Sequence, residues 1–419
     1  MNVSARRAFA LLKEMAYERV SCTENETRAA ERLLEEVKKS GADGWIETFT
    51  VPCGRVHHAK LVVTEPYVKE YECTGYERSM STPEGGLDAE FYYAEDLLPE
   101  NLEFAKGKAV LINGRLRRSS YEKLQKAGVS AILTYSGTTV DRRSETDCDV
   151  RKLREVFTEP FGFNVALNIR AEDAAEIVRR GAKKMHIEVD SECYDGTSRN
   201  VCAVIPGEKY PDEIISFGAH YDSTRFSTGV YDNMSGSVVI MELLKYFAEH
   251  RPARTMKFNW FGSEEQGLLG SKAWVRDHID ELDRHVLMIN VDVVGATLGR
   301  NEAVIMATEP VGGYVNGLMR EIGIPCKILH VCMSSDGVPF ADNGVPVINF
   351  VRSGADGANY IHERRDNLRS GYIDEKSLGI SLDAALHLAR RVDGSAVCPV
   401  PREISEDIKG KIDEYLFRK

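Results

Sequence analysis

Beyond Thr197 the sequence alternates short apolar runs with amphipathic stretches, and this alternation limits the fold more than any other feature. The predicted strands cover residues 200–205, 213–219, 255–260, 286–291 and 346–351. The predicted helices cover residues 236–250, 270–278, 375–392 and 404–417. Strands joined through helices run parallel, because the crossover returns the chain to the end of the sheet from which it started. We therefore expect an α/β fold with a mixed, mainly parallel sheet sandwiched by helices.

Two helices are predicted at the start of the sequence, at residues 5–20 and 24–40. The second begins with the capping box Thr23-x-x-Glu26, which satisfies the first amides of a helix. It stops at Gly41, because glycine readily adopts the left-handed conformation that ends helices. Both helices precede the region in which the pattern of the sequence changes.

From about residue 53 to residue 190, strand-like runs alternate with loops and a single helix, which predicts a separate domain. The predicted strands before and within this region cover residues 45–51, 60–64, 109–113 and 131–135. We expect residues 1–52 and 196–419 to form one discontinuous domain. Residues 53–195 should form a smaller, β-rich α/β domain inserted into it.

The composition excludes several classes of protein. A formal net charge of −11 at pH 7 argues against a nucleic-acid partner, which would need a basic surface. No apolar run approaches the length of a membrane span, and Arg6, Arg7 and Lys13 interrupt the N-terminal apolar positions, unlike a secretory signal. Nine scattered cysteines without CxxC spacing predict neither a disulfide framework nor a thiolate zinc site. We expect a cytoplasmic protein, and the sequence leaves open whether it forms a homo-oligomer.

Five short strings rich in histidine and acidic residues lie mostly at or just after predicted strands. They are Gly218 to Ser223, Gly229 to Gly236, Phe261 to Ser271, Ile289 to Asp292 and Tyr360 to Asp366. Open α/β sheets place their sites beyond the carboxyl ends of the strands. Each string alone has a structural explanation, such as a helix N-cap or a solvated helix start. Together they place several acids beside buried strands, where carboxylates would repel one another unless a cation compensated them.

These strings resemble those of the zinc aminopeptidase and glutamate carboxypeptidase family of co-catalytic exopeptidases, in the family's order, from about residue 200 to residue 392. The resemblance implies a zinc exopeptidase fold, a peptide substrate and two zinc ions, for which Mn²⁺ or Co²⁺ can substitute. Residues 104–135 are similar to a protease-associated domain, which several members of the family carry as an insertion.

Carried over position by position, the resemblance implies a set of five metal ligands: His220, Asp232, Glu265, Asp292 and His362. Asp232 would bridge both ions. Glu265 and His362 would complete one site, and Asp292 would complete the other together with His220. Nitrogen and oxygen ligands of these types suit zinc, and two neighbouring ions can acidify a shared water and polarise a carbonyl.

Two further acids have implied roles without being ligands. Glu264 would act as the general base, since a carboxylate on a metal has lost the basicity that proton transfer needs. Asp222 would orient the imidazole of His220. In the family, the peptide bond after the bridging aspartate is cis, which predicts a cis bond between Asp232 and Asn233.

The end of the peptide that is cut stays open at this point. An aminopeptidase acting on short peptides is favoured, because Glu264 and Glu265 offer acids that could hold a free ammonium group. A carboxypeptidase would need a cationic clamp, for which Arg352, Arg364 and Arg365 are the candidates. A glutaminyl cyclase would use a single metal. A non-catalytic binding relative is disfavoured, because every ligand position is filled.

The sequence departs from the family's pattern at one position. Many members have a tyrosine directly before the last histidine, where its hydroxyl can stabilise an oxyanion, but Ile361 stands here. Tyr360 is a candidate for that role, and a packed aromatic is an equally good interpretation. The remaining histidines considered lack the flanking pattern and are predicted to be surface or hydrogen-bonded residues: His57, His58, His278, His285 and His330.

Overall fold

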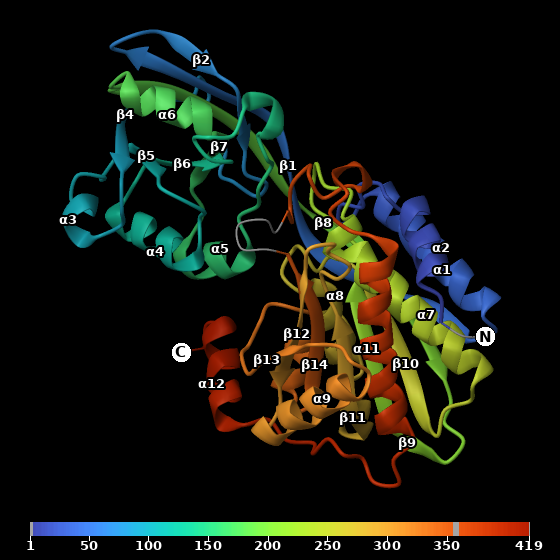
Figure 1. Ribbon diagram of the computed structural model, residues 1–419. Helices are drawn as coiled ribbons and strands as arrows, with labels where there is room; N and C mark the ends of the chain where they lie inside the picture. The colour runs from blue at the N-terminus through green and yellow to red at the C-terminus, as the bar shows by residue number, and fades with distance from the viewer. Residues whose placement is uncertain (1–2, 355–359, 419) are drawn as a thin grey trace. The chain divides into compact units, whose positions relative to one another are not determined.

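The computed structural model describes residues 3–354 and 360–418 and divides into two compact units (Figure 1). The larger unit comprises Met1–Val51 and Thr197–Lys419, and the inserted unit comprises Pro52–Gly196. Among the described residues, no helix has the length and apolarity needed to cross a bilayer. The described residues also form no disulfide.

The larger unit is built on a mainly parallel sheet, which confirms the predicted α/β fold. Its strand order is β13-β12-β14-β11-β9-β10-β8. The four central strands, β14, β11, β9 and β10, are all parallel, whereas β8 and β12 pair antiparallel with their neighbours β10 and β14. The strands are β8 Lys184–Ile205, β9 Tyr210–His220, β10 Arg254–Phe261, β11 His285–Val291, β12 Arg300–Met306, β13 Lys327–Leu329 and β14 Val347–Ser353.

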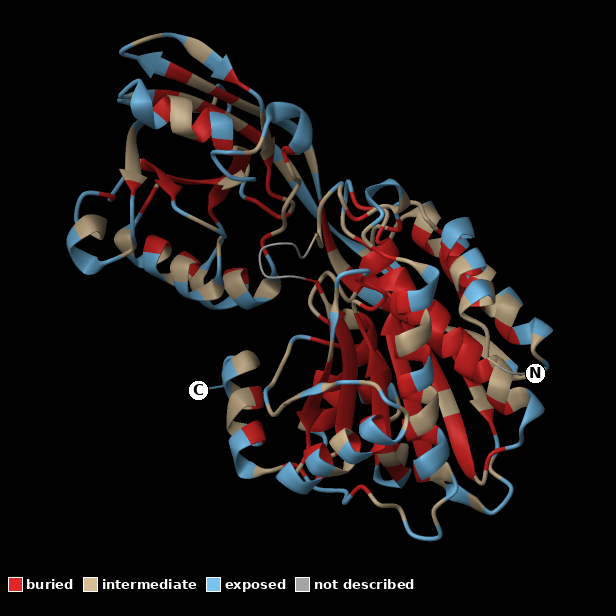
Figure 2. Cartoon of the chain, in the orientation of Figure 1, coloured by how far each residue is buried: buried red, intermediate tan, exposed pale blue. Residues whose placement is uncertain are grey.

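Two hydrophobic cores pack against this sheet. One core includes apolar residues of α1 Ala5–Glu14, α2 Glu24–Lys39, α7 Ser235–Glu249, α9 Glu309–Glu321 and α11 Glu375–Asp393. The other includes residues of α8 Leu269–Asp277, α10 Gly337–Asp342 and α12 Glu406–Tyr415. Figure 2 shows that the central strands and α7 are almost entirely buried. Strands buried on both faces are expected for a parallel sheet that helices cover on each side.

The first helix is shorter than predicted, because it ends at Glu14 and not near residue 20. The cause is the buried side chain of Arg19, which donates hydrogen bonds to the carbonyls of Met15 and Tyr17. In a continuing helix, the Met15 carbonyl would accept from the backbone amide of Arg19. The second helix agrees better: the Thr23 hydroxyl accepts from an amide in its first turn, as predicted.

Residues 45–51 and 60–64 were predicted as separate strands, but both lie in one strand, β1 Asp43–Glu65. Gly54 does not mark a turn. Its backbone lies so close to Arg78 that a Cβ at this position would be 2.3 Å from the Arg78 amide nitrogen. The strands β12 and β13 and the helix α9 were not predicted, because their short apolar runs carry little periodicity.

The inserted unit contains a second, smaller set of strands. The order β8-β4-β5-β6-β7-β3 continues from the first part of β8, and β2 pairs with β1. The strands are β2 Lys69–Tyr71, β3 Cys73–Gly75, β4 Leu87–Ala94, β5 Ala109–Ile112, β6 Ala131–Ser136 and β7 Val165–Arg170. The helices are α3 Pro99–Leu102, α4 Arg118–Ala127, α5 Glu155–Phe161 and α6 Ala171–Arg179. The unit has its own hydrophobic cores, so it is an α/β body in its own right.

A polar contact between α2 and α7 predicts a pH dependence of stability. Glu36 accepts hydrogen bonds from Lys245 at 2.7 Å and from Arg32 at 2.8 Å. Burial raises the pKa of Glu36, but these hydrogen bonds outweigh burial and lower the pKa to about 2. A carboxyl with a lowered pKa stabilises the fold above its unfolded pKa of about 4.3, and the contribution is lost as the pH falls towards the folded value.

We therefore expect Glu36→Gln to lower the melting temperature at pH 7, and the difference from the wild type to narrow between about pH 5 and pH 3. Thermal unfolding of both proteins across this range measures the effect. A difference that stays constant with pH would show that the charge of Glu36 contributes nothing.

Candidate metal centre

The candidate site lies at the carboxyl edge of the four parallel strands. His220 is the last residue of β9, and Asp292 directly follows β11. Glu264 and Glu265 come shortly after β10, and His362 comes in the loop after β14. The carboxyl ends of parallel strands meet at one edge of a sheet, so residues far apart in the sequence converge there.

The predicted ligands form two groups that share one carboxylate. The first group is His220, Asp232 and Asp292, and the second is Asp232, Glu265 and His362. Within each group the ligand atoms all lie within 4.8 Å of one another. Asp232 serves both groups through different oxygens: Oδ1 lies 3.1 Å from His220 Nε2, and Oδ2 lies 3.0 Å from His362 Nε2. This arrangement is the one that a bridging ligand would adopt.

The spacing of these atoms fits zinc. Donor atoms bound to a tetrahedral zinc at about 2.0–2.1 Å lie roughly 3.3 Å from one another. Here His220 Nε2 lies 3.5 Å from Asp292 Oδ1, and His362 Nε2 lies 3.1 Å from Glu265 Oε2. Asp292 Oδ1 is buried and has no hydrogen-bond partner among the described residues. A buried carboxylate oxygen without a donor is costly unless a cation meets it.

The electrostatics of the cluster follow from burial and from neighbouring charges. Burial raises the pKa of Asp292 and of Glu265, and the negative charge of Asp232 adds to both effects. Burial also raises the pKa of Asp232, but the two histidines outweigh it, so that its pKa is lowered. The site is therefore a concentration of buried negative charge that the two imidazoles only partly balance.

Glu264 lies beside the cluster without belonging to either group of ligands. Burial raises its pKa well above the ordinary value, and the charges of Asp336 and Glu265 add to this although His220 opposes it. A carboxylate in such surroundings accepts a proton more readily than one in water. Glu264 thus has the chemistry of a base beside the metal ligands.

Asp222 makes three contacts that order the site. Its Oδ1 lies 3.3 Å from His220 Nδ1, on the opposite side of the ring from the ligand nitrogen. The same carboxylate accepts hydrogen bonds from the backbone amides of Glu264 and Glu265, at 3.0 and 3.2 Å. Asp222 therefore fixes the orientation of the imidazole and the course of the loop after β10 together.

Asn233 connects the loop of Asp232 to β11. The side-chain nitrogen of Asn233 donates to the backbone carbonyl of Val291, and its side-chain oxygen accepts from the backbone amide of Val293. These two hydrogen bonds hold the chain on both sides of Asp292. The peptide bond between Asp232 and Asn233 is cis, as predicted. This role of Asn233 was not recognised from the sequence, because it depends on which strand lies beside the loop.

The backbone around the ligands is strained at three residues. Ser263, Val293 and His362 have φ angles of 55°, 46° and 59°, in the left-handed region that residues with side chains seldom adopt. The value for Val293 is the most unusual, because its Cβ is branched. Such strain persists only where surrounding contacts hold the backbone in place, as the hydrogen bond from the Val293 amide to the Asn233 side chain does here.

Two of the three arginines considered as a carboxylate clamp have partners outside the ligand groups. Arg352 is only 8% exposed, and its guanidinium donates to the carbonyl of Ala296 and to Asn301. Arg365 lies 2.6 Å from Glu363. Arg364 is exposed on the same loop. The buried position of Arg352, with Nε and Nη1 donating within the larger unit, disfavours it as a clamp.

Tyr360 is held in a cluster of aromatic rings. Its ring lies 5.3 Å from that of Tyr372 in an edge-on arrangement, and the guanidinium of Arg365 lies 4.6 Å from its centre. Tyr372 in turn packs edge-on against Tyr231, at 4.9 Å. These contacts favour the interpretation of Tyr360 as a packed aromatic.

Two carboxylates near the site were missed in the sequence. Asp336 is fully buried just before α10, and burial raises its pKa to about 7. Asp366 is 1% exposed and lies four residues after His362. The signal that identified the other acids, a position just beyond a predicted strand, was not available for Asp336, because it lies in the segment between β13 and α10 and β13 was not predicted. Asp366 stood within a recognised string, but nothing local reveals its partners.

The other histidines do not join the cluster. His57 and His58 contact Glu192 and Glu188 within the inserted unit. His285 is buried and contacts the hydroxyl of Ser216. These three histidines, which were predicted to be surface or hydrogen-bonded residues, thus have their partners outside the metal centre.

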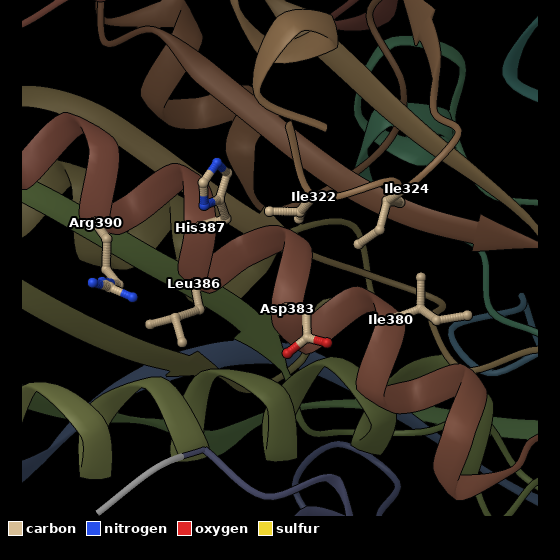
Figure 3. Close-up of a pocket in the computed structure, with 7 residues that line it drawn as sticks. All are labelled: Ile322, Ile324, Ile380, Asp383, Leu386, His387 and Arg390. Atoms are coloured by element: carbon tan, nitrogen blue, oxygen red, sulfur yellow. The ribbon is translucent and has the colours of Figure 1, made fainter. Parts of the chain in front are cut away.

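A pocket of about 310 Å³ lies elsewhere on the larger unit (Figure 3). Aliphatic side chains next to α9 and on α11 line it, with Asp383, His387 and Arg390 as its polar residues. None of the predicted site residues lines this pocket, so it is separate from the candidate metal centre.

Comparison with known proteins relates this chain to peptidases. The sequence pattern of Peptidase family M28 matches residues 200–389, which include all five predicted ligands. The aminopeptidase YwaD of Bacillus subtilis is 28% identical over 357 residues, covering 81% of this chain and 73% of YwaD. Carboxypeptidase Q of Mus musculus is 25% identical over 301 residues, covering 67% of this chain but only 63% of that protein.

The fold also has a counterpart among solved structures. BSAP, a zinc aminopeptidase from Bacillus subtilis, superimposes with a TM-score of 0.77, covering 97% of this chain and 99% of BSAP. The sequences are 23% identical in that superposition, so this likeness concerns the fold. It extends over both units of the chain.

Proposed function

We propose that this zinc-dependent exopeptidase, whose residues 200–389 match peptidase family M28, is an aminopeptidase acting on short peptides through two zinc ions. The observation that carries the proposal is the pair of ligand groups joined by Asp232. A single shared carboxylate with one oxygen directed to each group is the arrangement that two neighbouring ions require.

In this proposal each ion has three protein ligands. His220 and Asp292 would hold one ion together with Asp232, and Glu265 and His362 would hold the other. The bound metals would acidify a water molecule and polarise the scissile carbonyl. The buried negative charge of the ligands supplies the attraction that such an ion needs, and the imidazoles bind it when they are neutral.

The proposed catalytic base is Glu264. It follows β10 directly beside the ligand Glu265, and the amide hydrogen bonds to Asp222 fix its backbone. Glu264 takes the proton of the attacking water at its carboxylate and later delivers it to the departing amine. Asp222 holds the His220 ring by its Nδ1 side, which leaves Nε2 directed into the cluster.

An amino-terminal cut is favoured over a carboxy-terminal one by the charges of the site. Outside the ligand groups, the acids Glu264 and Asp336 lie by the site, and a carboxylate there suits the positively charged ammonium of a peptide's first residue. The buried guanidinium of Arg352 already donates to two acceptors, so it offers no grip for a terminal carboxylate. YwaD is an aminopeptidase, and carboxypeptidase Q is the alternative that the relatives suggest.

The inserted unit, which we propose to be of the protease-associated type, supplies no ligand. The two ligand groups come entirely from residues 220–362, and His57 and His58 have partners in their own unit. We propose that this unit contributes to the choice of substrate.

We expect the zinc-loaded protein to release amino acids from unblocked and C-amidated peptides but not from N-acetylated ones. Digests of three peptides that share one sequence and differ only in these end groups measure the preference. Release from the unblocked and N-acetylated peptides but not from the C-amidated one would reverse the assignment in favour of a carboxypeptidase. Arg352→Ala is the matched control: it should destabilise the protein and leave the end preference unchanged.

Metal analysis separates the proposal from a glutaminyl cyclase or a binding relative. Two ions per chain support the peptidase, one points to the cyclase and none to a binding protein. The presence of all five ligands and of Glu264 favours the first outcome.

A further inference from the structure

The loop that carries His362 is fastened to the segment that carries Asp232. We call residues 227–232 the strap; they lie within the segment that connects β9 to α7. The carboxylate of Asp366 accepts hydrogen bonds from the amide of Tyr231 at 2.8 Å and from the amide of Asp232 at 3.1 Å. One buried side chain thus holds the strap at the residue whose carboxylate is shared by both ligand groups.

The same two segments are also joined through the backbone of Asp366. Its carbonyl accepts from the hydroxyl of Thr228 at 2.9 Å and from the Thr228 amide at 3.2 Å. The hydroxyl of Ser227 donates to the Asp366 carboxylate at 3.3 Å. The contacts therefore run along the whole strap and not only at its end.

A buried arginine holds the strap by its carbonyl groups. Arg19 is fully buried and donates to the carbonyl oxygens of Thr228 at 2.6 Å and Gly229 at 2.9 Å. It also donates to the carbonyl of Tyr221, next to His220. The Asp366 side chain thus accepts from amides of the strap while the Arg19 side chain donates to its carbonyls, so the segment is held from both sides.

We propose that Asp366 is a positioning residue of the metal centre, which fixes Asp232 between the two ligand groups by holding its amide and that of Tyr231. The proposal rests on the two-metal site described above. Carboxylates that hydrogen-bond around a metal centre keep the ligands in place, and their loss commonly weakens metal binding about 10–100-fold. Asp366 acts here on a ligand's backbone, as Asp222 does for Glu265.

The test compares Asp366→Asn with the wild type. Asparagine has nearly the same shape, but only one of its two terminal atoms can accept from an amide, so one of the two hydrogen bonds is lost. We expect zinc affinity, measured by competition with a chromogenic chelator, to fall about 10–100-fold. The rise in melting temperature on adding zinc should shrink as well. A merely structural role would lower the melting temperature of the zinc-free and zinc-loaded forms equally.

The matched control is Asp374→Asn. Asp374 caps α11 by accepting from the amide of Ser377, and it touches no residue of either ligand group. We expect it to lower stability without changing zinc affinity. If Asp366→Asn does not fold, Thr228→Val decides: the loss of its hydroxyl bond to Asp366 should weaken zinc binding about two- to ten-fold.

If Asp366→Asn binds zinc as tightly as the wild type, the role of Asp366 alone is overturned. Where that variant does not fold, equal zinc affinity of Thr228→Val and the wild type has the same meaning. Absence of zinc binding in the wild type would overturn the two-metal site and this inference with it.

Discussion

Glu264→Gln is expected to lower turnover by about 10²–10⁴-fold while leaving the fold and the metal content intact. The amide has almost the same shape as the carboxylate but cannot take up the proton of the attacking water. Glu264 is outside both groups of ligands, so its replacement removes no donor from the metals. Steady-state kinetics on a peptide substrate, with metal analysis of the same sample, measures both parts of the expectation.

Glu406→Gln makes the same chemical change on a side chain that is 89% exposed, and it should leave turnover unchanged. Unchanged turnover in Glu264→Gln would remove Glu264 from the mechanism. A loss of metal together with turnover would instead place Glu264 among the ligands.

The second large effect is expected for Asp232→Ala, which should lose both ions and all measurable turnover. Its two oxygens face different groups, so its removal takes a ligand from each. Burial raises the pKa of the remaining carboxylates, Asp292 and Glu265, so that without an ion it is unfavourable for both to be ionised together. Metal analysis after gel filtration measures the loss.

Asp212→Ala is the control for this experiment, because Asp212 is 92% exposed and pairs with Arg284 at the surface, away from the ligand groups. Its metal content should equal that of the wild type. Retention of both ions by Asp232→Ala would refute the bridging role. Retention of one ion would show that the two groups bind independently.

The parts of the fold that the sequence predicted well are those with strong local signals. The boundaries of β9, β10 and β11 were predicted within about three residues, because apolar runs flanked by polar residues mark buried strands. The edge of the sheet at which the ligands meet followed from parallel pairing. The five predicted ligands, Glu264 and Asp222 lie close together there, although the string from Tyr360 to Asp366 does not directly follow β14.

The parts that were predicted badly depend on tertiary contacts. Periodicity favoured a helix through residue 20, but the chain turns after Glu14, where Arg19 takes up carbonyl groups. Residues 45–51 and 60–64 were predicted as separate strands, whereas both lie in β1, in which Gly54 allows a close approach of the backbone at Arg78. In both cases the structure depends on a contact with a residue far away in the sequence, about which local propensity carries no information.

The same reasoning explains why Asp366 and Asn233 were missed as organising residues. Both act on backbone groups of other loops, and neither the donor nor the acceptor of such a bond has a sequence signature. A metal ligand needs a particular side chain, and so its string is recognisable. A residue that holds a ligand's amide needs only a partner that the fold brings to it.

The insertion within the larger unit sets an order of events during synthesis. The hydrogen bond between Arg7 on α1 and Glu242 on α7 joins residues 235 positions apart. A ribosome adding about 5–20 residues per second needs roughly 12–47 s to cover that distance. Residues 52–196 are contiguous and emerge before α7, so the inserted unit can fold while the larger unit is still incomplete. Until α7 emerges, the apolar side of α1 has no surface to cover it, and the nascent chain offers chaperones a binding segment near its start.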